Sequence, residues 1–222
     1  NLLFCWGNNA WGRLGIGSTA NSDFGPSIVN FDNGRYAIEV SVGNSHTCAL
    51  LDNNFVSCWG RSNSGRIGNG DISDSSTINR PTNVTIIPNG LTVNSISVGM
   101  THTCAILSDN SVFCWGSGIY IASHDGERYF FPPNNPPVSI ESGYEFSCAI
   151  MFNGSLNCWG ENNNGELGIN STVDKSTPQY VDLGSGITVD SFNTDYRHSC
   201  VILSNGSLKC WGPNTNGNLG TG

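Results

Sequence analysis

Short β-branched runs recur along the chain, and no stretch shows the sustained spacing of an amphipathic helix. Four of these runs lie at residues 38–43, 93–99, 138–143 and 187–192, and each precedes a pair of cysteines ten residues apart. A Gly-x-Leu/Ile-Gly segment follows the second cysteine in most units. Runs of this length and composition are typical of strands. We therefore expect an all-β protein whose units read as strand, strand and glycine-rich loop.

Copies of Cys-Trp-Gly define the frame of a repeat. They begin at Cys5, Cys58, Cys114, Cys158 and Cys210. A further cysteine stands ten residues before each of the last four copies, at Cys48, Cys104, Cys148 and Cys200. A motif that returns about every fifty residues is the signature of a repeat architecture.

The segment between paired cysteines fits a β-hairpin. If Cys48 faces Cys58, residues 52–54 form a three-residue loop whose last member, Asn54, is left-handed. The corresponding positions in the other hairpins are Asn110, Gly154 and Gly206. Asn tolerates this conformation and Gly prefers it. Opposed positions on antiparallel strands lie slightly beyond disulfide range, and local twist closes the gap. The predicted hairpin disulfides are Cys48–Cys58, Cys104–Cys114, Cys148–Cys158 and Cys200–Cys210.

The cysteine content favours an oxidising compartment. Nine cysteines in 222 residues exceed the usual number for a cytosolic chain of this size. Asn-x-Ser/Thr triplets point the same way and occur at Asn83, Asn153, Asn170 and Asn205. We expect a secreted or cell-surface protein that carries N-linked glycans.

The charge balance argues against some partners. Nine Lys and Arg stand against seventeen Asp and Glu, and the net charge of -8 is not gathered into one block. Nucleic-acid binding depends on phosphate neutralisation by basic residues, so no nucleic-acid partner is expected. No run of about eighteen apolar residues is present, so no membrane span is expected in this segment.

Residues 46–70 and 198–222 read HTCALLDNNFVSCWGRSNSGRIGNG and HSCVILSNGSLKCWGPNTNGNLGTG. They resemble the regulator-of-chromosome-condensation repeat in the cysteine-bearing form of extracellular proteins. The resemblance implies a β-propeller of four-stranded blades, with four full repeats and a partial one. The repeats lie approximately at 1–17, 36–70, 91–125, 137–170 and 186–222. Residues 1–222 would form one propeller or a segment of a longer one. One repeat departs from the pattern, because Phe146 replaces the usual His and the glycine loop before it is missing.

Three histidines, His46, His102 and His198, stand two residues before a paired cysteine. A metal site needs three or four converging ligands, and one histidine per blade disperses them around a ring. We expect each imidazole to be buried and to bond backbone within its own blade. Five of the six tryptophans fall in the repeat frame and are expected to pack between blades, whereas Trp11 falls outside it. No cofactor or metal is expected.

The sequence contains no local signature of catalysis. A Gly-x-Ser-x-Gly elbow is absent, and the acidic residues Asp71, Asp74 and Asp182 have surroundings typical of solvated surface. The founding member of the family exchanges nucleotide on a small GTPase, and the loops that would carry this activity are not recognisable here. We expect a protein that is not an enzyme.

Three connections, residues 18–35, 71–90 and the insert after Trp115, depart most from the repeat. Loops presented on a rigid scaffold are where function is expected. The insert carries four aromatic residues beside paired prolines, namely Tyr120, Tyr129, Phe130 and Phe131. They either form a protein interface or cover the edge of the next blade.

Cys5 is the ninth cysteine and lacks a partner in the repeat frame. Its partner is expected about ten residues upstream in a longer chain, or on a neighbouring subunit in a head-to-tail ring or filament. The function we expect is a non-enzymatic structural or adhesive module, a glycosylated subunit of a cell-surface or filamentous assembly. The alternative is a receptor or inhibitor ectodomain that binds a protein ligand through its propeller loops.

Overall fold

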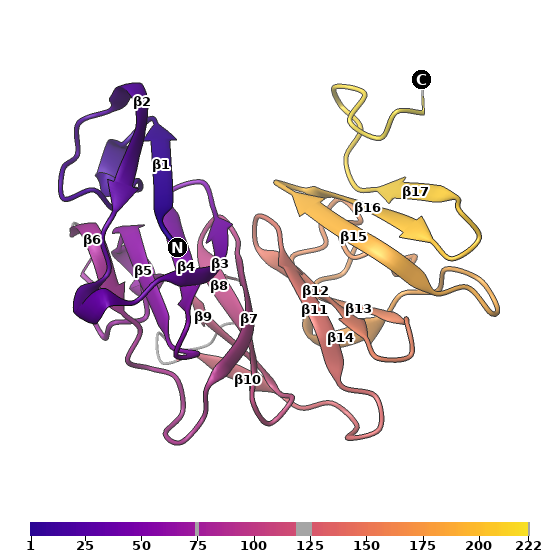
Figure 1. Cartoon of the computed structure of the whole chain (residues 1–222). Coiled ribbons are helices and arrows are strands. Elements are labelled where there is room, and N and C mark those ends of the chain that lie inside the picture. The colour runs from indigo at the N-terminus through magenta and orange to yellow at the C-terminus, as the bar shows by residue number, and fades with distance from the viewer. Residues whose placement is uncertain (74–75, 119–125, 222) are drawn as a thin grey trace.

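The computed structural model describes residues 1–73, 76–118 and 126–221, whose strands form five antiparallel sheets in chain order (Figure 1). We call the sheets blades 1 to 5. Blade 1 contains β1 (Leu3–Gly7) and β2 (Ser22–Val29), and blade 2 contains β3 (Ala37–Val42), β4 (His46–Leu51), β5 (Val56–Arg61) and β6 (Thr77–Asn83). Blade 3 contains β7 (Val93–Val98), β8 (His102–Leu107), β9 (Val112–Gly116) and β10 (Glu127–Tyr129), and blade 4 contains β11 (Pro137–Ser142), β12 (Phe146–Met151), β13 (Leu156–Gly160) and β14 (Lys175–Tyr180). Blade 5 contains β15 (Val189–Asp195), β16 (His198–Leu203) and β17 (Leu208–Trp211). Short 3-10 helices η1 (Ala10–Gly12), η2 (Asp32–Gly34) and η3 (Asn63–Gly65) lie in the connections. The predicted class, an all-β protein built of propeller blades, is confirmed.

Each complete blade is a meander in which consecutive strands pair. The first strands of blades 2 to 5, which are β3, β7, β11 and β15, lie beside one another along the axis of the arc. Figure 1 follows this succession from the indigo N-terminal blade to the yellow C-terminal blade. Over the ranges described here, no strand of blade 5 pairs with blade 1. None of the helices in these ranges is long and apolar enough to cross a membrane.

The hairpin prediction is confirmed in register and in backbone conformation. Cys48 pairs directly with Cys58 across β4 and β5, and the other three cysteine pairs have the same register. The last loop residue is left-handed in every hairpin, with φ values of 62° at Asn54, 66° at Asn110 and 77° at both Gly154 and Gly206. Residue choice at this position therefore fixes the register that opposes the cysteines.

The outer strands lie within the connections that depart most from the repeat. β2 falls within residues 18–35, β6 within 71–90, and β10 within the insert after Trp115. Proline at Pro26, Pro81 and Pro178 and many polar residues mask the strand signal. Proline is tolerated because an outer strand is an edge strand and pairs on one side alone.

The core lies between blades. One cluster joins Leu50 and Val56 of blade 2 to Val93 and Leu107 of blade 3, and the other clusters join neighbouring blades in the same way. Each stabilises the fold through apolar burial of two blades at once.

The tryptophans confirm the packing prediction in part. Trp59, Trp115 and Trp159 are at most 3 % exposed, and Trp211 is partly buried. Trp6 is 64 % exposed, and the described residues include no blade before blade 1 against which it could pack. Trp11 is also exposed and lies against the guanidinium groups of Arg13 and Arg61.

Candidate functional site

Four disulfides join the second strand to the third in blades 2 to 5. They are Cys48–Cys58, Cys104–Cys114, Cys148–Cys158 and Cys200–Cys210, with Cα–Cα distances of 4.0 to 4.2 Å. The cysteines of blades 2 to 4 are essentially inaccessible to solvent, and each pair lies on the face turned toward the next blade. The sulfur atoms are therefore part of the contact between blades.

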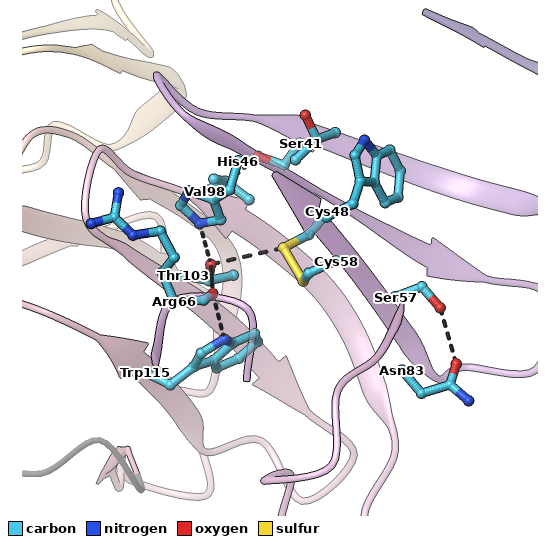
Figure 2. The surroundings of a disulfide bond; sticks show 12 residues. Ser41, His46, Cys48, Ser57, Cys58, Arg66, Asn83, Val98, Thr103 and Trp115 are labelled. Carbon is cyan, nitrogen blue, oxygen red and sulfur yellow. Dashed lines mark hydrogen bonds between the residues drawn. A yellow bond between two sulfur atoms is a disulfide. The ribbon is translucent and has the colours of Figure 1, made fainter. Parts of the chain in front are cut away.

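A histidine and a hydroxyl group meet beside two of these disulfides. His46 Nε2 lies 2.9 Å from Thr103 Oγ1, and His102 Nε2 lies 2.8 Å from Ser147 Oγ. Figure 2 shows His46 and Thr103 next to the Cys48–Cys58 bond. The expectation of a backbone bond within one blade is wrong for His46 and His102, because each ring reaches a hydroxyl on the following blade. His198 is only partly buried, so the expected burial is wrong there. Among the described residues no group of His, Cys, Asp or Glu could hold a metal ion.

Both imidazoles are neutral at pH 7. Burial lowers the pKa of His102 to about 4, with a further contribution from the positive charge of Arg66. Burial, then Arg66, also lowers the pKa of His46 well below its usual range. The Thr103 hydroxyl donates to the Arg66 carbonyl oxygen, so His46 Nε2 acts as the donor to Thr103 Oγ1.

The glycine loop of one blade packs against the tryptophan of the next blade and accepts a hydrogen bond from it. The indole N–H groups of Trp59, Trp115 and Trp211 donate to the carbonyl oxygens of Arg13, Arg66 and Glu166, at 2.9, 3.0 and 2.8 Å. A Cβ added at Gly68 would lie 2.7 Å from the Trp115 ring, and Gly15 and Gly168 are equally close to their tryptophans. The last glycine of Gly-x-Leu/Ile-Gly is therefore required by close packing against an aromatic ring.

The third repeat replaces its glycine loop by aromatic packing. Tyr129 is 7 % exposed and its ring centroid lies 5.1 Å from that of Trp159, while Phe131 packs against the same cluster. These two residues cover the next blade, which is the second of the two roles expected for the insert. Phe130 is 72 % exposed and keeps its assignment to a protein interface as a prediction. Tyr120 lies outside the described residues.

The contact between blades 4 and 5 has different polar side chains at the position that His46 and Thr103 occupy between blades 2 and 3. We call these side chains the polar centre of a contact. Phe146 fills the histidine position, is 1 % exposed and packs against Gly143. Arg197 Nη1 lies 2.8 Å from Glu161 Oε1 and 3.4 Å from Glu166 Oε1. At the contact between blades 2 and 3, by comparison, Arg66 donates to the Met100 carbonyl oxygen.

An open cavity of about 440 Å³ lies on the axis, at the turns between first and second strands. It is lined by residues 41–44, 97–100, 141–144 and 193–196, one segment from each of blades 2 to 5. These turns and the glycine loops form one face of the arc, which we call the loop face. The hairpin tips that precede β5, β9, β13 and β17 form the opposite tip face.

The predicted glycosylation sites are exposed and unevenly distributed. Asn153 and Asn205 lie at hairpin tips, and Asn83 pairs with Ser57 close to the tip of its blade. Asn170 lies in a glycine loop on the loop face. Three of the four sites are thus on the tip face, and glycosylation itself stays a prediction.

Cys5 is a free thiol on the edge strand β1. It packs against the cluster that contains Trp59, and burial raises its pKa above the usual value. It occupies the position that Cys58 has in blade 2, whereas the strand that would carry its partner is not among the described residues.

Comparison with known families identifies the repeat. A profile described as "Regulator of chromosome condensation (RCC1) repeat" matches residues 1–50, 56–106 and 153–202, and a second profile of the same description matches 37–66, 93–120, 138–166 and 196–218. The chain belongs to the RCC1 repeat family. It is therefore an RCC1-like propeller chain, a protein-interaction module.

Individual proteins of similar sequence or similar fold align with most of the chain. The ultraviolet-B receptor UVR8 of Arabidopsis thaliana is 26 % identical over 99 % of this chain and 51 % of its own length. The crystal structure of human WBSCR16 superposes with a TM-score of 0.79 at 22 % identity, over 91 % of this chain and 53 % of the other. The ectodomain of the Physcomitrella patens receptor kinase CR4 superposes with a TM-score of 0.52 at 23 % identity, over 81 % and 42 %. The chain thus spans about half the length of UVR8 and WBSCR16.

Proposed function

We propose that the chain is a secreted or cell-surface RCC1-like module that binds proteins without catalysis and serves as a glycosylated structural or adhesive subunit. The observation that carries the proposal is the set of four hairpin disulfides, three of them buried between blades. Disulfides of this kind persist in oxidising compartments and are rare in the cytosol. The exposed sequons and the acidic surface fit the same setting.

Expression in cultured mammalian cells, with and without an added secretion signal, tests this proposal. With the signal we expect a secreted chain whose mass falls after endoglycosidase treatment and whose eight hairpin cysteines resist alkylation until they are reduced. Without the signal we expect poor folding yield. A chain that folds in the cytosol with reduced cysteines, and is neither glycosylated nor secreted with the signal, would contradict the proposal.

Assembly through Cys5 is part of the proposed structural role. The thiol lies on β1, which pairs only with β2 among the described residues, and a strand from another subunit could pair on its other side. We expect covalent oligomers of the secreted chain on non-reducing gels, and their loss in Cys5→Ser. Identical gels for the two proteins would remove covalent self-assembly from the proposal and leave the remainder intact.

The second candidate is a receptor ectodomain, favoured by the fold that the chain shares with the CR4 ectodomain. Flanking sequence separates the two candidates. A membrane span followed by a kinase domain favours the receptor, and further copies of the repeat without a span favour the structural subunit.

A further inference from the structure

The axial cavity combines an acidic lining with an aromatic rim. Glu141 and Asp195 are its charged lining residues, and no lysine or arginine appears among the residues that line it. Tyr144 and Tyr196 also line it, with ring centroids 4.9 Å apart in an edge-to-face arrangement. Tyr196 is 56 % exposed. The four turns thus form a concave site that presents negative charge and two phenol rings.

Among the described residues, no cation forms an ion pair with Glu141. Burial, and secondly the negative charge of Glu39, raise the pKa of its carboxyl, and no neighbouring cation opposes them. Glu39 is better satisfied, because Ser95 Oγ and the Ile96 amide donate to its Oε1 atom. A half-buried carboxylate without a cation is costly, and an added positive charge would stabilise it.

The arginines near the rim are already engaged. Arg197 lies over the Tyr144 ring at 4.5 Å, and its charge is balanced by Glu161 and Glu166. Arg13 and Arg66 donate to the carbonyl oxygens of the turns at Asn44 and Met100 from the glycine-loop side. The charged groups that line the cavity are therefore the two carboxylates, and the guanidinium groups lie behind the lining.

The rim resembles the centre of a protein interface. Tyrosine and arginine are enriched among residues that dominate binding energy, and here two tyrosines and Arg197 stack together. Tyr196 has a φ of 21°, an uncommon value for a residue other than glycine. The equivalent turn residues of blades 2 and 3 are Asn44 and Met100, so the aromatic rim is confined to blades 4 and 5. Most of the predicted glycosylation sites lie on the tip face, which leaves this face accessible.

We infer that the axial cavity docks a lysine or arginine side chain from a loop of a protein partner, which passes the Tyr144–Tyr196 pair and ends at Glu141. The inference rests on the proposed protein-binding function and specifies its face and its partner chemistry. Charge complementarity selects the occupant, because a neutral or acidic side chain would leave Glu141 uncompensated. The exposed Tyr196 ring contributes cation–π attraction along the entry path, whereas Arg197 already lies over the Tyr144 ring.

Titration of the isotope-labelled full chain with a (Gly-Arg)3 peptide, followed by amide NMR, tests the inference directly. We expect the largest shift changes at the turn amides of Gly99, Met100, Gly143 and Tyr144. A (Gly-citrulline)3 peptide has nearly the same shape without the charge and should cause little change. Shift changes scattered over the acidic surface, or equal for both peptides, would overturn the inference.

Variants give the second arm of the test. Glu141→Gln should weaken (Gly-Arg)3 binding about tenfold, the value expected for the loss of one charge-assisted contact. Asp32→Asn on the tip face removes the same charge and should leave the affinity within about twofold. Equal weakening by both variants would mean attraction by net charge alone and would overturn the inference.

Tyr196→Ala removes an exposed side chain and should fold normally while weakening binding severalfold, so the test stands even where Glu141→Gln fails to fold. Failure of the cavity is distinguishable from failure of the proposed function. A chain that is secreted, glycosylated and disulfide-bonded but shows no localised (Gly-Arg)3 binding loses the cavity inference alone. A chain that binds the peptide at the cavity but is folded and reduced in the cytosol keeps the cavity and loses the proposed extracellular role.

Discussion

The contact between blades 2 and 3 and the contact between blades 4 and 5 share a glycine loop, a tryptophan and a disulfide. They differ at the polar centre, where the first has the neutral pair His46 and Thr103 and the second has the ion pair of Arg197 with Glu161 and Glu166. The shared parts act through backbone carbonyl groups and close packing, so they need fixed residue types. The polar centre needs only matched partners, so it can vary from blade to blade.

Acid pH should have the largest effect on the difference in stability between these contacts. The unfolded chain binds protons to His102 below pH 6.5, whereas the folded chain does so only near pH 4, so stability is complete above pH 6.5 and is lost as pH falls toward 4. The loss from His102 alone is roughly 3 kcal/mol. Hydrogen exchange corrected for intrinsic rate, at pH 7 and 4.5, should show two contacts opening more at acid pH than the contact between blades 4 and 5. They are the contact between blades 2 and 3, which contains His46, and the contact between blades 3 and 4, which contains His102. His102→Phe should flatten the pH dependence, and an unchanged profile in that variant would contradict the assignment.

Removal of a disulfide should lower the unfolding free energy by nearly as much. Two such variants compare the contact between blades 2 and 3 with the contact between blades 4 and 5. The variants C48A/C58A and C148A/C158A open hairpins of equal length, so each should lose about 3 kcal/mol of unfolding free energy. The first should lose slightly more, because Cys48 Sγ also lies 3.8 Å from the Thr103 hydroxyl. Urea unfolding followed by tryptophan fluorescence measures both. A smaller loss for C48A/C58A would argue against a role of the sulfur in the polar centre.

Replacement of the arginines should separate the ion pair from the neutral centre. Arg197→Met leaves the fully buried Glu166 without its cation and should cost about 2 kcal/mol. Arg66→Met removes bonds to the Ser45 hydroxyl and the Met100 carbonyl and should cost about 1 kcal/mol. Thermal unfolding of the two variants side by side tests the order. The reverse order would mean that the carboxylates find other partners.

Replacement of His46 by phenylalanine, the residue at the equivalent position of blade 4, should have the smallest effect on the unfolding free energy. His46→Phe loses the bond to Thr103 but keeps an aromatic ring, and the Thr103 hydroxyl still donates to the Arg66 carbonyl oxygen. We expect a loss of about 1 kcal/mol in urea unfolding. His46→Ala is the matched control and should lose more, because it also leaves a cavity. Equal losses would show that the hydrogen bond outweighs the packing of the ring.

The sequence predicted whatever depends on local chemistry. The left-handed Asn54 and Gly154 and the opposed cysteines follow from the requirements of one hairpin, and the glycine loop follows from a motif. The histidine contact was missed because its partner lies 57 residues away in the chain. A signal was present, since Thr or Ser precedes each first cysteine of a pair, and Thr47, Thr103 and Ser199 all donate to the preceding glycine loop.

The axial cavity could not be predicted from the sequence, because its four turns come together only when the blades stack. Neither Glu141 nor Tyr196 belongs to a recognisable motif. The outer strands were also hidden, because an edge strand with proline reads as a loop until a neighbour pairs with it.

The four hairpin disulfides also determine how the chain would respond to mechanical load. A pulling force can separate one blade from the next and unravel the outer strands, but each loop closed by a disulfide stays shut. Each disulfide thereby prevents the extension of a segment of ten residues. This segment corresponds to about 35 Å of contour length in every hairpin. An adhesive subunit built in this way would lengthen in limited steps under tension, and reduction would release the withheld length.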